Sequence, residues 1–276
     1  MQTNNELVSG SGRSWTTHRL STGAFMFTIK RLLAMFAFLI ALLVLPVAAQ
    51  ITAGPTTGCG GGGTGCAATA INTIGTTLRV ATITVRNYTA GDTYYVFDDP
   101  VPSCTIPWTY LTPYIHGSDL IVIGYEAGCT TFASEVYHGY WIFNSQGFLN
   151  VKTYSGTLTT SGVFLAGSDS GAVTSGATSL ATGSVTPDGT GRLVVSAWGA
   201  ETSADIVGLA VNSGLGNLQA GCVGAYACGG FADLIDSSSG AINPTWTWTD
   251  SQPAEVAVAI FEPAVTARPP SRVRIF

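Results

Sequence analysis

The chain has 276 residues and a formal net charge of −5, and 10% of its residues are charged where about 25% is usual. Hydrophobic residues make up 46% of the chain, which is too many for an intrinsically disordered protein. The negative net charge excludes a nucleic-acid binder that relies on broad electrostatic attraction, so no nucleic-acid partner is expected. The length allows one domain or two.

The N-terminal part of the chain has the pattern of an export signal. An apolar run, LLAMFAFLIALLVLPVAA, occupies residues 32–49 directly after Lys30 and Arg31. It predicts a hydrophobic signal helix with cleavage after Ala49, so residues 1–49 are assigned to an N-terminal extension and signal peptide. The run is also long enough to span a bilayer, which leaves an uncleaved anchor as the alternative. We expect a secreted protein that has no membrane attachment after cleavage.

The part of the chain that follows the signal is more acidic than the whole. Residues 50–265 contain four basic and 15 acidic residues, a net charge of −11. Several acidic residues bracket predicted strands, Asp119 with Glu126 and Glu255 with Glu262. We expect them to be solvated charges at strand ends that discourage edge-to-edge pairing.

All six cysteines lie after residue 49, and an even number of cysteines in an exported chain predicts disulfide bonds. Short loops favour Cys59–Cys66 and Cys222–Cys228, which leaves Cys104–Cys129, although the sequence leaves all 15 pairings open. The spacings C-x6-C and C-x5-C do not match a zinc knuckle. We therefore expect neither a metal nor a cofactor.

Short β-type runs separated by turn residues follow a Gly/Thr-rich lead or linker at residues 50–76. Because no amphipathic helix of 12 or more residues is evident, the pattern predicts an all-β fold, an antiparallel β-sandwich of jelly-roll-like type. The sandwich domain is assigned to 77–263 and a disordered tail to 264–276. Residues 155–190 are expected to be loops with one edge strand. The predicted strands are 77–85, 92–98, 119–126, 136–143, 148–154, 192–198, 205–212, 244–250 and 255–262.

Two stretches carry a resemblance to known proteins: LATGSVTPDGTGRLVVSAW at residues 180–198 and NPTWTWTDSQPAEVAVAIFEP at 243–263. Together they resemble a pattern in exported bacterial proteins for which no activity is established. The front half matches less well, since a Cys-containing insertion, PVPSC, interrupts the Asp-turn-WT element of that family. The resemblance covers about a third of the exported chain, and it implies a secreted β-sandwich without catalytic residues.

Trp246 and Trp248 are two residues apart, so on a strand they point to the same face, with Thr245, Thr247 and Thr249 on the other. An exposed tryptophan pair could stack on sugar rings. Threonine is well suited to a solvated strand face, so we expect both tryptophans to fill the sandwich core.

A denser aromatic group surrounds a pair of adjacent aspartates, and loops at the end of a sandwich commonly carry binding groups. Tyrosine and tryptophan at such loops are typical of carbohydrate-binding and adhesive surfaces. This group is the predicted binding surface, with polysaccharide or cell-surface glycans as the candidate partner. It comprises Tyr94, Tyr95, Asp98, Asp99, Trp108, Tyr110 and Tyr114.

No catalytic set is convincing, so the sequence favours a non-catalytic binding or structural role at the cell exterior. A glycosidase needs two carboxyl groups across the scissile bond, and the alternative of a sandwich-fold polysaccharide hydrolase would use Glu126 and Glu135. A serine triad assembled from His116, Asp119 and Ser170 lacks the flanking sequence of such enzymes. The second alternative is a self-assembling surface-layer or appendage subunit.

Overall fold

A computed structural model describes residues 51–156, 164–201, 208–223, 227–236 and 238–262, within a compact unit that spans Ala48–Phe276. The predicted signal and the predicted tail lie outside the described residues. In the part of the chain that is described, the regular elements are β-strands. None of its segments is a helix with the length and hydropathy that a membrane crossing requires.

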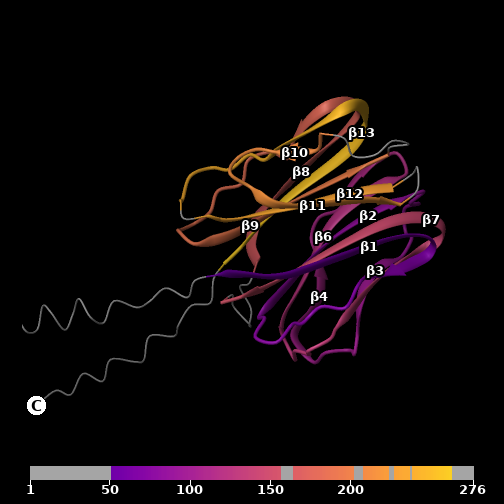
Figure 1. The fold of residues 1–276 in the computed structure, drawn as a ribbon. Helices are drawn as coiled ribbons and strands as arrows, with labels where there is room; N and C mark the ends of the chain where they lie inside the picture. Colours follow the sequence, from indigo (N-terminus) through magenta and orange to yellow (C-terminus); the bar gives the residue numbers. More distant parts are fainter. Residues whose placement is uncertain (1–50, 157–163, 202–207, 224–226, 237, 263–276) are drawn as a thin grey trace, which may run out of the picture. The chain divides into compact units, whose positions relative to one another are not determined.

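Seven antiparallel strands form the first sheet (Figure 1). The strands β1, β7, β2, β6 and β4 are neighbours in that order, while β3 pairs with β7 and β5 with β6. Their bounds are β1 (Thr52–Ala67), β2 (Leu78–Arg86), β3 (Tyr94–Asp99), β4 (Cys104–Tyr110), β5 (Tyr114–His116), β6 (Asp119–Cys129) and β7 (Val136–Ser155).

Six antiparallel strands form the second sheet, in the order β10, β13, β9, β12 and β11, with β8 also paired to β13. Each sheet is thus built from one continuous half of the described chain. The bounds are β8 (Phe164–Ala181), β9 (Arg192–Ala200), β10 (Ala210–Val211), β11 (Gly216–Val223), β12 (Ala227–Asp236) and β13 (Thr245–Phe261).

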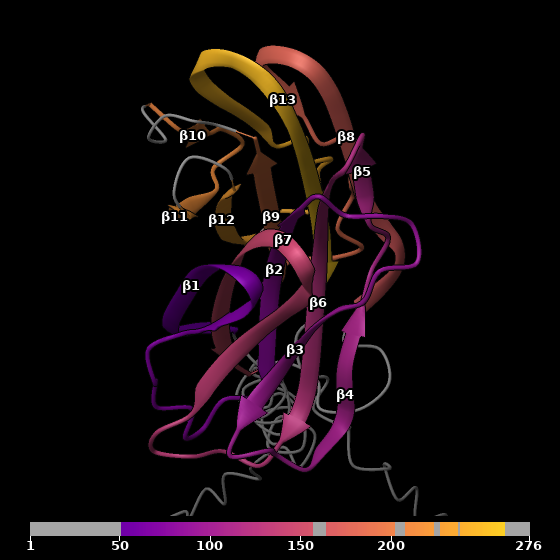
Figure 2. The ribbon, with the colours of Figure 1, turned by 90° about the vertical axis from the view of Figure 1, so that its right-hand side faces the viewer.

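The two sheets pack face to face around an apolar core, which confirms the predicted antiparallel β-sandwich (Figures 1 and 2). Leu78 and Val80 of β2 lie in this core with Val195 of β9 and Phe231 of β12. The outer faces of both sheets are also covered by apolar side chains. Because β2 is buried on both faces, its polar residues are interior as well as its apolar ones, namely Arg79, Thr82, Thr84 and Arg86.

The Gly-rich residues 52–67, expected to be a linker or a lead, form the edge strand β1, paired with β7 along most of its length. Glycine is required there for close approach. A Cβ atom at Gly60 would collide with Val223 of β11, and Gly65 has a positive φ of 146° with the Gly139 carbonyl against it. The glycine run therefore builds a strand that side-chain periodicity could not reveal.

Two pairs of predicted strands are continuous in the structure. The runs at 136–143 and 148–154 belong to β7, and those at 244–250 and 255–262 belong to β13. Residues 164–181, part of the stretch 155–190 expected to be loops with one edge strand, form the long edge strand β8. The strands β4, β5, β11 and β12 were not predicted, and of residues 205–212 only Ala210–Val211 are described as strand.

The tryptophan pair is buried, as predicted, but it lies outside the core between the two sheets, where it was expected. Trp246 and Trp248 are 0% and 6% exposed on the outer face of the second sheet, whereas Thr247 is exposed. The indole of Trp246 donates a 2.8 Å hydrogen bond to Ser196 Oγ, and the Trp248 ring lies 5.8 Å from that of Trp198. This part of the molecule therefore offers no exposed indole for sugar stacking.

All six cysteines form disulfides, in the pairing that short loops favoured. Cys59–Cys66 lies within β1. The other two bonds join residues that face each other across strand pairs, Cys104–Cys129 between β4 and β6 and Cys222–Cys228 between β11 and β12. Three disulfides indicate that the protein matures in an oxidising environment.

Candidate functional site

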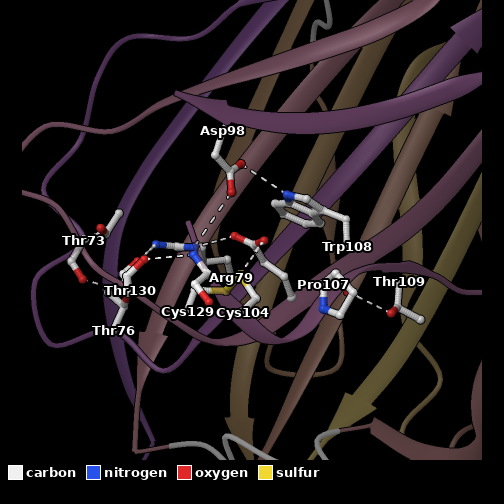
Figure 3. The surroundings of a disulfide bond; sticks show 12 residues. Thr73, Thr76, Arg79, Asp98, Cys104, Pro107, Trp108, Thr109, Cys129 and Thr130 are labelled. Atoms are coloured by element: carbon white, nitrogen blue, oxygen red, sulfur yellow. Dashed lines mark hydrogen bonds and ion pairs between the residues drawn. A yellow bond between two sulfur atoms is a disulfide. The ribbon is translucent and has the colours of Figure 1, made fainter. Parts of the chain in front are cut away.

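The most concentrated set of charges among the described residues surrounds Arg79 of β2 (Figure 3). Glu126 faces Arg79 directly across the β2–β6 pair, and its Oε1 lies 2.6 Å from Nη1. Oε2 of Glu135, the residue before β7, lies 2.8 Å from Nη2. Asp98 of β3 approaches Nη1 at 3.8 Å. One guanidinium group is therefore the counter-charge of three carboxyl groups.

Neutral groups complete this arrangement. The Thr73 hydroxyl donates a 2.6 Å hydrogen bond to Glu135, and the Trp108 indole donates to Asp98 at 3.1 Å. The carbonyl of Thr130 accepts a 3.0 Å bond from Arg79 Nη2. The Cys104–Cys129 disulfide closes one side, with Cys104 Sγ 3.3 Å from Glu126 Oε2. We call Arg79, Asp98, Glu126 and Glu135 the Arg79 cluster.

The excess of carboxyl groups changes their protonation. Burial, together with the negative charge of Asp98, raises the pKa of Glu126 to about 9, so this carboxyl group is neutral at pH 7. Burial also raises the pKa of Asp98 and of Glu135. Burial opposes the charge of Arg79, but its pKa is raised by Tyr137, Glu126 and Glu135. The cluster thus holds a proton that an exposed carboxylate would lose.

A protonated carboxyl next to a carboxylate is the pair that a glycosidase uses, but this pair is closed to substrate. Arg79, Asp98, Glu126 and Glu135 are all between 0% and 3% exposed. Glu126 and Glu135, the residues of the hydrolase alternative, are bound to the two Nη atoms of one guanidinium. The arrangement compensates buried charge, and the structure gives the hydrolase alternative no accessible acid and base.

Two further groups of charges, buried except for the exposed Glu201, lie nearer the interface between the sheets. In the first, Arg86 of β2 pairs with Asp119 at 3.1 Å and with Glu201. Glu255 of β13 is fully buried, and burial with the nearby charge of Asp119 raises its pKa to about 9. In the second, Lys152 Nζ lies 2.6 Å from Asp233 Oδ2.

The expectation that strand-end acidic residues are solvated is therefore wrong for three of the four. Asp119, Glu126 and Glu255 are 4%, 1% and 0% exposed. The first two pair with arginines of the neighbouring strand β2, whereas Glu255 is sheltered as a neutral acid. Glu262 is partly buried at the end of the described chain.

The predicted aromatic binding group divides between the interior and the surface. Asp98 belongs to the Arg79 cluster, and Trp108 packs at 6.4 Å against Tyr137. Tyr94 and Tyr110 pack edge to face at 5.7 Å, and the Tyr110 hydroxyl accepts a hydrogen bond from the Val96 amide.

The remaining members of that group lie elsewhere. Tyr114 of β5 lies against Gly171 of β8, where β5 pairs with the start of β6. Tyr95 and Asp99 are exposed, because alternate residues of β3 point outward. The group is therefore not one surface.

The outward face of β3 and β7 carries four rings, of which sequence reasoning selected one. Tyr95 stacks on Tyr140 and Phe97 stacks on His138, each with ring centroids 4.5 Å apart. Tyr95 and Phe97 are 38% and 41% exposed. We call these four residues the aromatic platform. The sequence shows that Tyr95 and Phe97, two residues apart on one strand, point to the same face. Their partners on β7 depend on the register of the β3–β7 pair, which the sequence does not show.

Neither a serine triad nor a metal centre is formed by the residues considered for them. Ser170 Oγ donates to the Thr182 carbonyl at 2.8 Å, and Asp119 is bound by Arg86. Within the described ranges, the group of potential metal ligands that lie close together is Cys104, Glu126 and Cys129. Because their sulfur atoms form a disulfide, this group has no thiolate to offer a metal.

In comparisons with known proteins, no family model, no curated protein and no solved structure matches this chain.

Proposed function

We propose that the protein is exported through the signal at residues 1–49, is cleaved after Ala49, and acts at the cell exterior as a non-catalytic binding protein. Three disulfides suit an oxidising compartment. The carboxyl pair that could support hydrolysis is closed, whereas an aromatic surface is open. The resemblance to exported bacterial β-sandwich proteins agrees with this role.

The observation that carries the proposal is the aromatic platform, and the proposed ligands are glycans of a cell surface. The apolar face of a pyranose packs on an aromatic ring while its hydroxyl groups remain in water. On β1, Gly65 faces Tyr140 and Ala67 faces His138. Ala67 is small and exposed, so a sugar can approach the His138 end of the platform from that side.

Replacing Tyr95 and Phe97 together by alanine is expected to abolish glycan retention, because both cross-strand stacks lose one ring. The measurement is binding of the exported protein to a glycan array and to purified cell-wall material. Truncating Ile115, which is 42% exposed on β5, to alanine is the matched control and should leave binding unchanged. The platform is not the binding surface if the double variant binds as well as the parent, or if the parent binds nothing.

One observation favours a second candidate function, a self-assembling surface subunit. The edge strand β8 has 18 residues, contains one charged residue, Asp169, and lacks lysine and proline. It is hydrogen-bonded to β13 on one side, and no strand pairs with its other side among the described residues. Long edges without such blocking residues favour strand addition between molecules.

If β8 mediates assembly, the purified protein forms filaments or sheets at high concentration, seen by negative-stain electron microscopy. A Thr178→Lys substitution should prevent them, because it places a charge on the exposed part of β8. Thr247→Lys on β13, a strand paired on both sides, is the control and should not. A protein that stays monomeric at every concentration would remove this candidate.

A further inference from the structure

An open groove of about 700 Å³ lies where β1 of the first sheet approaches β11 of the second. Both views place these strands on the same side of the molecule (Figures 1 and 2). Its walls are residues 53–56 of β1 and 217–220 of β11, and Lys152 of β7 also lines it. The groove exists because β1 carries small side chains there, including Ala53 and Gly54.

Lys152 is a buried side chain with unused hydrogen-bonding capacity. It is 3% exposed. The sequence after residue 49 contains a single lysine, and Lys152 is that residue. Its ammonium group has three N–H donors. Among the described residues its partner is Asp233 Oδ2, at 2.6 Å. The remaining donors lie beside the groove that this side chain lines.

Two amide groups next to Lys152 also have unpaired atoms. Asn150 lies two residues away on the same face of β7, is fully buried, and has no hydrogen-bond partner at Oδ1 among the described residues. Gln219 of β11 lines the groove and has no partner at its buried Oε1. Both amides point toward Gly58, where a Cβ would lie 3.2 Å from Asn150 Oδ1 and 3.3 Å from Gln219 Nε2. Buried polar atoms without a partner are rare in folded proteins.

The charge of the groove floor is already balanced. Asp233 faces Lys152 and also accepts a 2.5 Å hydrogen bond from the Tyr154 hydroxyl and a 2.6 Å bond from Asn217 Nδ2. An anion would find the ammonium charge neutralised. A neutral ligand with hydroxyl groups, which both donate and accept, matches the unpaired donors of Lys152 and the unpaired amide oxygen of Gln219, the two of these groups whose residues line the groove.

Apolar groups at the rim of the groove complete the match. Pro55 and Leu218 line it, and Leu218 is 42% exposed. A sugar has an apolar C–H face and a polar hydroxyl edge, and this wall offers a surface for each. We propose that the groove between β1 and β11 is a binding site for a neutral carbohydrate, held by Lys152, Asn217 and Gln219. This site is separate from the aromatic platform and does not depend on it.

The test uses the exported protein and saturation-transfer NMR with neutral disaccharides (maltose, cellobiose, mannobiose and diacetylchitobiose) and with inorganic phosphate. We expect at least one disaccharide to bind and phosphate to show no binding. Gln219→Ala should weaken that binding by up to about tenfold, since it removes the hydrogen bonds of one amide. Ala220→Trp should abolish it by filling the groove from an exposed position. Lys152 is left in place, because its removal would strand the buried Asp233.

Ala90→Trp, the same change at an exposed loop residue, is the control and should bind as the parent does. The groove proposal is overturned if no disaccharide binds, if phosphate competes for the site, or if Ala220→Trp leaves the affinity unchanged. The double alanine variant of Tyr95 and Phe97 should retain the groove signal. If this double variant loses glycan-array binding but keeps the groove signal, the two sites act independently. The two proposals can then fail separately.

Discussion

An Arg79→Met variant is expected to lose about 3–5 kcal/mol of unfolding free energy at pH 7, a large part of the stability of a typical domain. Arg79 is the nearest cation to three buried carboxyl groups, and it also binds the Thr130 carbonyl. Methionine preserves most of the side-chain volume, so the loss would arise from the carboxylates left without a counter-charge. Urea denaturation followed by tryptophan fluorescence measures it.

Arg192→Met is the matched control. Arg192 pairs with Asp188, whose side chain is 55% exposed, and such surface pairs contribute about 0–1 kcal/mol. The deficit of Arg79→Met should shrink at about pH 4, because the stranded carboxyl groups can then take up protons. Equal losses for the two arginine variants would contradict the assignment of Arg79 as the centre of a buried cluster.

The sequence predicted those parts of the fold that depend on local alternation. The parity of Trp246 and Trp248 identified their buried face, and the apolar run at 119–126 identified β6. Local spacing also favoured the observed disulfide pairing. In each case the information lies within a few residues of the chain, where side-chain direction on a strand is fixed by geometry.

The Arg79 cluster could not be predicted, because it depends on strand register. Arg79 and Glu126 are 47 residues apart and meet because β2 and β6 pair with these two residues opposite each other. Shifting that register by one residue would turn one of the two side chains to the other face of the sheet. The sequence grouped Asp98 with Asp99 and Glu126 with Glu135, but it gave no reason to connect either group with Arg79.

The few basic residues between positions 50 and 265 are mostly buried, which the low charge content of the sequence did not indicate. Arg79, Arg86 and Lys152 are all buried, so three of the four basic residues between positions 50 and 265 are interior groups. Each is paired with at least one buried carboxyl group. The interior therefore depends on a few specific charge contacts, and the surface is left acidic with little positive charge.

The pH dependence of stability follows from the two carboxyl groups whose pKa is about 9, Glu126 and Glu255. Their ordinary pKa is near 4.5, so between about pH 4.5 and 9 the folded protein holds protons that the unfolded chain releases. The stabilisation is complete below about pH 4.5 and is lost as the pH rises through the folded-state pKa. Unfolding free energy should therefore decrease from pH 5 to pH 9, by up to about 1.4 kcal/mol per pH unit for each group.

Glutamine in place of either residue should flatten this dependence, because the amide stays neutral at every pH and resembles the protonated acid. At pH 9 the Glu126→Gln and Glu255→Gln variants should melt above the parent, and at pH 5 close to it. Asp250→Asn, at an exposed position of β13, is the control and should keep the slope of the parent. Melting temperatures across this range measure the effect. Parent stability that rises with pH would mean that Glu126 and Glu255 are ionised in the folded state.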